Sequence, residues 1–188
     1  MRGLEPVVER LARAGVSPDA VTLAAVPIGV VGGACLLLSP TVPLLLLAIP
    51  VLAAVRLVMN LIDGALARRV GRMHPRGELY NELGDRLADI AFLAPVAFLP
   101  GASQATVLLG VVGALFASVA GLAPRAAGGE RLYRGILSKP GRMVLLSVFA
   151  VVVLIAGPGA WGPFGPLLLA GTVLTAIERI VVGVRRLA

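Results

Sequence analysis

Residues 56–89 read RLVMNLIDGALARRVGRMHPRGELYNELGDRLAD, and this polar stretch interrupts a chain that is otherwise strongly apolar. The 188 residues are 58% hydrophobic and only 14% charged, and the mean hydropathy is +0.95. A soluble domain of this size carries about 25% charged residues. Because so few charges are available to cover a water-exposed surface, the sequence predicts an all-α polytopic membrane protein.

The apolar segments on either side of the polar stretch have the length of membrane spans. A bilayer core about 30 Å thick needs roughly 20 helical residues. We therefore expect six transmembrane helices in a single domain over residues 1–188. Their approximate ranges are Val21–Leu38, Val42–Ile62, Leu79–Leu99, Thr106–Ala123, Met143–Ala156 and Phe164–Val184. Before them, Leu4–Ala14 mixes apolar and charged residues, which predicts a short amphipathic helix on the membrane surface.

The distribution of basic residues predicts the orientation. All 17 Lys and Arg lie in the N-terminal segment, near the loops after the second and fourth spans, or at the C-terminal end. The three opposite loops carry no charge, and one of them contains Trp161, which suggests an interfacial anchor. The positive-inside rule then places both termini and the polar stretch in the cytoplasm of a cell-membrane protein. The net charge of +7 is explained in this way, so a nucleic-acid partner is not expected.

Helical spacing sorts the polar stretch into two faces. Residues three and four apart share one side of a helix, so Asn60, Asp63 and Ala67 lie together, with Gly64 beside them. A second stripe repeats every four residues, at Gly77, Asn81, Asp85 and Asp89. Glu82 and Arg86 are also four apart and can form an ion pair.

These polar groups reach deep into the membrane. The 11 residues from Glu78 to Asp89 span about 16 Å of helix, and a charge near the bilayer centre costs about 2.5–3.5 kcal/mol. The carboxylates must therefore face a hydrated cavity, pair with cations or bind metal, although hydrogen bonding between helices is an alternative. Clustered oxygen ligands suit Mg²⁺, and the small residues Gly64, Ala67 and Gly77 leave room for a ligand or for close helix packing.

The polar stretch resembles the motif of the CDP-alcohol phosphatidyltransferase family, D-x2-D-G-x2-A-R-x8-G-x3-D-x3-D. All the spacings hold, and six of the eight fixed positions match by identity. The eight positions are Asn60, Asp63, Gly64, Ala67, Arg68, Gly77, Asn81 and Asp85. The run Ser17-Pro18-Asp19-Ala20-Val21-Thr22 is similar to the Pro-Asn-x-x-Thr signature that often opens the first helix of the family.

The resemblance implies a role for each of these residues. Asn60, Asp63, Asn81 and Asp85 would surround one or two divalent ions, Mg²⁺ or Mn²⁺, that grip the pyrophosphate of a CDP-linked donor. Asp85 would also be the general base that deprotonates the acceptor hydroxyl. Gly64, Ala67, Arg68 and Gly77, with Thr22 as an additional candidate, would form the nucleotide pocket. Family members are typically homodimers, so the resemblance implies a homodimer as well.

Two asparagines depart from the family motif. Asn60 and Asn81 stand where the motif has Asp, and an amide oxygen can ligate a metal ion but carries no charge. Three outcomes are open. The site holds one metal ion, or Glu82 or Asp89 supplies the missing charge, or the protein is catalytically weak or inactive.

A second basic cluster follows the fourth predicted span. It contains Arg125, Arg131, Arg134, Lys139 and Arg142. These residues are either ordinary contacts to anionic lipid headgroups or a binding site for a phosphate on the acceptor, since Arg presents a fork that suits phosphate. The second interpretation favours glycerol 3-phosphate or inositol phosphate as acceptor, with Lys139 and Arg142 as first candidates. Arg125, Arg134 and Arg179 are further candidates, and His74 is expected to be a surface residue.

Three functional hypotheses follow. The first is a membrane phosphotransferase that moves a phosphatidyl group from a CDP-linked lipid to an alcohol and releases CMP. CDP-diacylglycerol is the expected donor. The second is a non-catalytic relative that binds nucleotide or lipid as a scaffold, which the two asparagines suggest. The third is a small transporter that uses the intramembrane acids as a relay, and no broken-helix repeat supports it.

Overall fold

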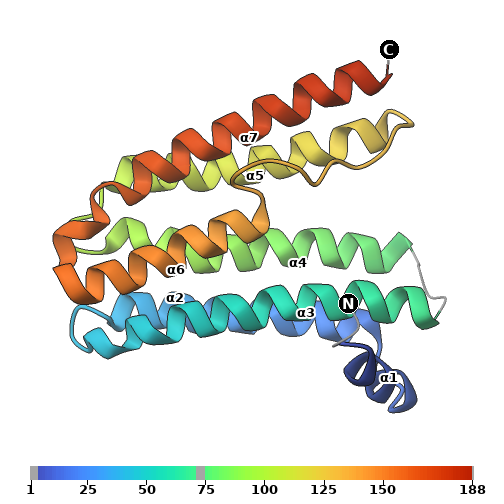
Figure 1. Cartoon of the computed structure of the whole chain (residues 1–188), viewed down its shortest axis with the longest axis horizontal. Helices are drawn as coiled ribbons and strands as arrows, with labels where there is room; N and C mark the ends of the chain where they lie inside the picture. The colour runs from blue at the N-terminus through green and yellow to red at the C-terminus, as the bar shows by residue number, and fades with distance from the viewer. Residues whose placement is uncertain (1–3, 71–74, 188) are drawn as a thin grey trace.

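The chain folds as an all-helical bundle, which confirms the predicted class (Figure 1). The computed structural model describes residues 4–70 and 75–187, and no strand occurs in these ranges. The α-helices are α1 (Glu5–Arg13), α2 (Pro18–Leu38), α3 (Ala48–Val70), α4 (Pro75–Leu93), α5 (Gln104–Ala126), α6 (Lys139–Ala156) and α7 (Phe164–Leu187). Three 3-10 helices join them: η1 (Pro43–Leu47), η2 (Ala94–Phe98) and η3 (Pro158–Trp161).

Five helical segments in the described ranges are long and apolar enough to cross a membrane, so the predicted count of six spans is not reproduced by length and composition alone. They are α2, η1 with α3, α5, α6, and η3 with α7. The predicted span Leu79–Leu99 corresponds to most of α4 and η2. It falls outside the five because α4 carries the polar stripe and other charged residues along its first four turns.

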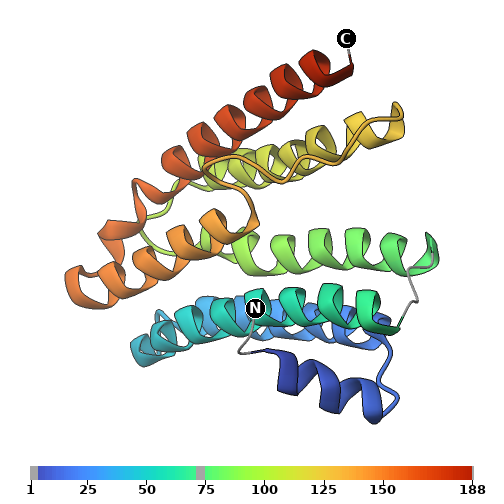
Figure 2. The ribbon, with the colours of Figure 1, turned by 45° about the vertical axis from the view of Figure 1, so that its right-hand side comes forward.

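Helix α4 lies between two groups of helices. It packs along α2, which also packs on α3, while α5 pairs with α7 on the other side (Figure 1). The α5–α7 pair diverges from α4 toward the end of the bundle where α1 lies, and both views show this divergence (Figure 2). The far end of the bundle is closed by η1, η2 and η3.

The predicted N-terminal amphipathic helix is present as α1. Its apolar side packs against α2 and α3, because Val8 is buried with Val21, Ile62 and Leu66. Gly15 follows with a positive φ of 69°, a conformation that glycine adopts at no steric cost and that helps to separate α1 from α2. Ser17 then caps α2 by accepting a hydrogen bond of 3.1 Å from the Ala20 backbone N–H.

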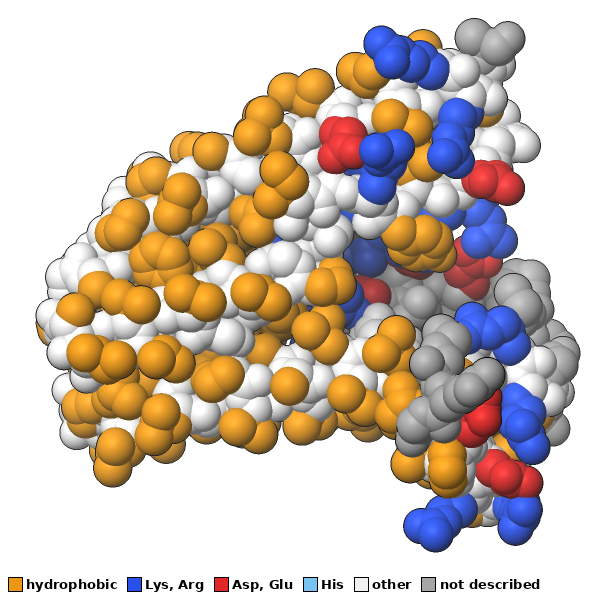
Figure 3. All heavy atoms as spheres, in the orientation of Figure 1, with side chains coloured by type: hydrophobic (Ala, Val, Ile, Leu, Met, Phe, Trp, Pro, Cys, Tyr) orange, Lys and Arg blue, Asp and Glu red, His pale blue; other side chains and the backbone are white. Residues whose placement is uncertain are grey.

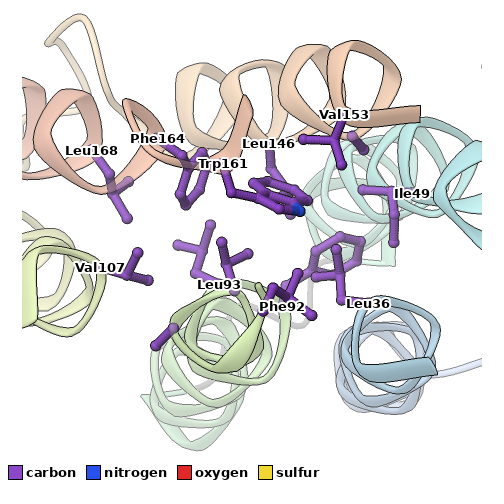
Figure 4. Close-up of a cluster of buried hydrophobic side chains, with 14 of the residues drawn as sticks. Leu36, Ile49, Phe92, Leu93, Val107, Leu146, Val153, Trp161, Phe164 and Leu168 are labelled. Carbon is purple, nitrogen blue, oxygen red and sulfur yellow. The ribbon is translucent and has the colours of Figure 1, made fainter. Parts of the chain in front are cut away.

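The apolar core occupies the end of the bundle away from α1. Side chains from α2, α3, α4, α5, α6 and α7 point toward one another there (Figure 4). Trp161 lies inside this core with 1% of its surface exposed, and its ring contacts Phe149 and Phe164. The prediction that Trp161 is an interfacial anchor is therefore wrong for the single chain, since η3 turns the indole inward.

Small residues allow α2 and α4 to approach closely. A Cβ atom added to Gly33 would lie 2.3 Å from the Ala91 backbone oxygen, so only glycine fits at this contact. Gly33→Ala should therefore destabilise the bundle by about 1–3 kcal/mol, the usual cost of overpacking. Thermal unfolding in detergent, followed by Trp161 fluorescence, measures the effect. Gly159→Ala is the matched control, because nothing lies within 4 Å of that position, and an equal shift in both variants would contradict the prediction.

Candidate active site

Charged side chains gather at the end of the bundle where α1 lies, and the opposite end of the same face shows apolar and uncharged groups (Figure 3). The charged end is hollowed, and basic and acidic side chains are visible inside the hollow (Figure 3). Two adjoining cavities open here, with volumes of about 650 Å³ and about 400 Å³. Both volumes fall within the range of small-molecule sites.

Helices α3 and α4 bring the eight motif positions to these cavities. Asn60, Asp63, Gly64, Arg68, Asn81 and Asp85 line the larger cavity. Ala67 and Gly77 line the smaller one, together with Thr22. The predicted metal and nucleotide residues therefore lie together, and Asp63, Gly64, Arg68 and Asn81 belong to both cavities.

The nucleotide candidates surround the smaller cavity near the start of α2. Thr22 donates a hydrogen bond of 3.0 Å to Asp63 Oδ2, which joins the first helix signature to the motif. Gly77 lies against Asp19, and a Cβ atom at Gly77 would come within 2.6 Å of the Asp19 carboxylate. A larger residue at position 77 would therefore have to move the Asp19 side chain.

The Asp85 side chain is largely buried beside two polar side chains. Its Oδ1 accepts a hydrogen bond from Lys139 Nζ of α6, and Asn60 Nδ2 lies 3.4 Å from each carboxylate oxygen. The Asp85 backbone oxygen accepts a bond of 3.0 Å from Arg56 of α3. The Asp85 carboxylate thus faces the larger cavity, and Arg56 of α3 holds the backbone of Asp85 in place.

The remaining oxygens fit a hard cation. Asn81 Oδ1 is buried and has no hydrogen-bond partner among the described residues. Asp63 lines the same two cavities and contacts the Thr22 hydroxyl. Carboxylate and amide oxygens are the ligands that divalent Mg²⁺ and Mn²⁺ prefer. The described residues contain no group of three His, Cys, Asp or Glu that could hold a metal ion, so the amide oxygens would have to complete the ligand set.

Asp89 lies one turn deeper on the predicted stripe and is bound by two arginines. Arg56 Nη2 of α3 lies 2.7 Å from Asp89 Oδ1, and Arg142 Nη2 of α6 lies 2.5 Å from Oδ2. All three side chains are less than 5% exposed. This triad joins α3, α4 and α6, and it leaves Asp89 without net negative charge for a metal ion.

Glu82 is similarly engaged. It forms the predicted ion pair with Arg86, and it also pairs with Arg131 from the loop after α5. The guanidinium of Arg131 lies 4.7 Å from the centre of the Tyr133 ring. Glu82 therefore anchors the loop that covers the site, and both Arg131 and Tyr133 line the two cavities.

The predicted acceptor cations fall into three groups. Lys139, Arg142 and Arg179 line the larger cavity, whereas Arg125 lines the smaller one and pairs with Glu78. Arg134 lines neither cavity and pairs with Glu178 at 2.6 Å.

Arg179 holds the loop between α5 and α6 in place. Its guanidinium donates hydrogen bonds to the backbone oxygens of Ala117, Arg134 and Tyr133, at 2.6, 2.8 and 3.2 Å. None of these bonds neutralises its charge. The larger cavity as a whole is lined by six cationic side chains and three carboxylates, which favours an anionic ligand.

Sequence reasoning missed Arg56 and Tyr133, and it named Arg131 only as one member of the second basic cluster. A basic residue in the apolar run four positions before Asn60 was a signal for Arg56, because an intramembrane charge needs a partner. Nothing in the local sequence separates Arg131 and Tyr133 from the other loop residues, since their position depends on how the loop folds back over α4. His74 lies outside the described residues.

Known proteins are similar to this chain over most of its length. No family model matches the chain. The inner membrane protein YnbA of Escherichia coli K12 is 30% identical over 152 residues, which cover 81% of this chain and 75% of YnbA.

Solved structures of Mycobacterium tuberculosis phosphatidylinositol phosphate synthase (PgsA1) have the same fold. The complex with manganese and citrate superposes with a TM-score of 0.76, at 23% identity, over 95% of this chain and 87% of that chain. The structure with CDP-DAG bound gives a TM-score of 0.68, at 25% identity, over 100% of this chain and 92% of that chain.

Proposed function

This chain belongs to the CDP-alcohol phosphatidyltransferase family, and from that membership we propose that it transfers a phosphatidyl group from a CDP-linked lipid to an alcohol, with release of CMP. CDP-diacylglycerol is the proposed donor, because the related synthase has been solved with CDP-DAG bound. The observation that carries the proposal is the convergence of all eight motif positions on two adjoining cavities.

The residues of the site suggest how the reaction proceeds. The acceptor hydroxyl oxygen forms a bond to the phosphatidyl phosphorus, the bond from that phosphorus to the CMP oxygen breaks, and Asp85 accepts the hydroxyl proton. Gly64, Ala67, Arg68 and Gly77, with Thr22, would hold the nucleotide. Asp63, Asn81, Asn60 and Asp85 are the candidate metal ligands, and a bound divalent ion would neutralise charge on the pyrophosphate.

We propose that the acceptor carries a phosphate, as in glycerol 3-phosphate or inositol phosphate. The support is the positive excess around the larger cavity, where Lys139, Arg142 and Arg179 line the same walls as Asp85. Arg125 would act on the donor side, because it lines only the smaller cavity. Arg134 is the weakest candidate, since it lines neither cavity.

The site is proposed to face the cytoplasm of a cell membrane. The support is the asymmetry of the basic residues, which the positive-inside rule relates to orientation. Figure 3 agrees with this asymmetry, because the charged groups lie at one end of the bundle. Family resemblance also leads us to propose a homodimer in the membrane.

Release of CMP from CDP-diacylglycerol by the purified full-length chain tests the function. With Mn²⁺ or Mg²⁺ we expect release with inositol phosphate or glycerol 3-phosphate, and little with inositol, glycerol or serine. EDTA should stop the reaction, because the donor pyrophosphate would keep its charge. Equal rates with inositol and inositol phosphate would contradict the proposed acceptor class, and no release with any acceptor would contradict the enzyme.

A non-catalytic scaffold is the second candidate, and Asn60 and Asn81 are the observation that favours it. The double variant Asn60→Asp/Asn81→Asp restores the motif and distinguishes the two. If the natural chain and the double variant both release CMP, the enzyme is supported. If only the double variant does so, the natural chain is a binding protein.

A further inference from the structure

The Asp85 carboxylate is already neutralised by groups of the chain itself. Lys139 Nζ contacts its Oδ1, and Asn60 presents its amide nitrogen, 3.4 Å from both oxygens. The side chains of Lys139 and Asp85 are only 16% and 11% exposed, so this ion pair is largely shielded from water. A metal ion on Asp85 would have to displace the ammonium group.

The side of the site that carries Asp63 and Asn81 has no such neutralising group among the described residues. Asp63 contacts a hydroxyl group, that of Thr22, and forms no ion pair within the described residues. Asn81 Oδ1 is buried and has no hydrogen-bond partner in the same part of the chain. Both residues line both cavities. The uncompensated carboxylate of Asp63 and the unpaired amide oxygen of Asn81 therefore lie at the junction of the two cavities. The ammonium group of Lys139 lies instead against Asp85.

The balance of charges in the site favours one bound divalent ion over two. Before a donor and its pyrophosphate bind, a pair of divalent ions brings four positive charges, and Asp63 and Asp85 supply two negative charges. Glu82 and Asp89 add nothing, because each is bound by two arginines. Uncompensated charge in a shielded site is costly, so two divalent ions beside Lys139 would be strongly disfavoured.

We propose that the Lys139 ammonium takes the place of a second divalent ion beside Asp85, and that the site holds one divalent ion at Asp63 and Asn81. The inference rests on the proposed function, since it concerns the cations of the same site. Asn60 fits this arrangement, because an amide N–H can donate to Asp85, whereas a carboxylate there would repel it. Lys139 is thus assigned a fixed positive charge that a metal ion would otherwise provide.

Counting bound Mn²⁺ without any donor lipid tests the inference. Binding of Mn²⁺ to the detergent-solubilised chain removes the six-line EPR signal of the free ion, so a titration gives the number of ions per chain. We expect one ion per wild-type chain, with the spectrum of an isolated Mn²⁺. Asn60→Asp/Asn81→Asp/Lys139→Met should bind two ions with a coupled spectrum. Its second ion should bind at least tenfold more tightly than in Asn60→Asp/Asn81→Asp, which keeps the lysine.

The controls separate charge from shape. Lys139→Arg keeps the positive charge and should bind one ion, as the wild type does. Trp161 fluorescence verifies the fold of each variant, because this indole lies in the distant apolar core. Binding of two ions to the wild type would overturn the inference. It would also be overturned if Asn60→Asp/Asn81→Asp and Asn60→Asp/Asn81→Asp/Lys139→Met bound their second ion with the same affinity. A chain that binds no Mn²⁺ would instead contradict the metal-dependent function.

Discussion

Replacing Asp85 with asparagine should lower the rate of CMP release by about 10²- to 10⁴-fold, the usual contribution of a positioned general base. Asp85 lines the larger cavity on α4, and two of the carboxylates near it are bound by arginines. Asp89 is bound by Arg56 and Arg142, and Glu82 is bound by two other arginines. An asparagine has nearly the same shape but cannot accept a proton at neutral pH, so catalysis should fail while the fold persists.

Single-turnover release of CMP from a saturating CDP-linked donor measures this loss without interference from product release. Glu9→Gln is the matched control, because Glu9 is an exposed acid on α1 that lines neither cavity. Its rate should equal that of the wild type. If Asp85→Asn retains the wild-type rate, the proton is accepted elsewhere. Asp63 would then be the next candidate, since it is the other acid on the cavity wall that no arginine binds within the described ranges.

Replacing Asp89 with leucine should destabilise the protein by about 3–5 kcal/mol, because the change leaves two buried arginines without a counter-ion. Arg56 and Arg142 are 0% and 2% exposed at the side chain, so water cannot replace the lost carboxylate. The triad also joins three helices, and Arg56 holds the backbone oxygen of Asp85. We therefore expect the change to disturb the larger cavity as well as to lower the stability of the bundle.

Thermal unfolding in detergent, followed by the fluorescence of Trp161, measures this destabilisation. Glu130→Gln provides the control, because the Glu130–Arg186 pair spans 3.5 Å with the glutamate 87% exposed, and such pairs contribute about 0–1 kcal/mol. The variant Arg56→Met/Asp89→Leu/Arg142→Met should recover part of the lost stability, because it removes the unpaired charges. If Asp89→Leu and the triple variant unfold at the same temperature, the charges of the triad do not explain the destabilisation.

Local periodicity predicted the part of the site that lies within each helix. The four-residue stripe on α4 and the spacing on α3 are properties of a single helix, so the grouping of Asn60 with Asp63, and of Asn81 with Asp85, follows from sequence alone. The Glu82–Arg86 ion pair is of the same kind, and the structure confirms it.

Contacts between helices could not be predicted in this way. The stripe shows Asp89 in line with Asp85, but it does not indicate that arginines of α3 and α6 converge on Asp89. Trp161 illustrates the same limit, because aromatic residues near a span end commonly anchor at the interface, and only the turn of η3 directs this one inward. The position of the loop carrying Arg131 depends on its ion pair with a residue 49 positions earlier, Glu82.

The arginine–aspartate–arginine triad also bears on how this protein can change over generations. Losing any one of Arg56, Asp89 and Arg142 alone passes through a state with unbalanced charge in a water-poor interior. Combined replacement of the three residues should therefore cost less stability than replacement of any one of them. The positions lie in three separate segments of the chain, yet their charges constrain one another, and the shape of the cavity beside Asp85 depends on all three.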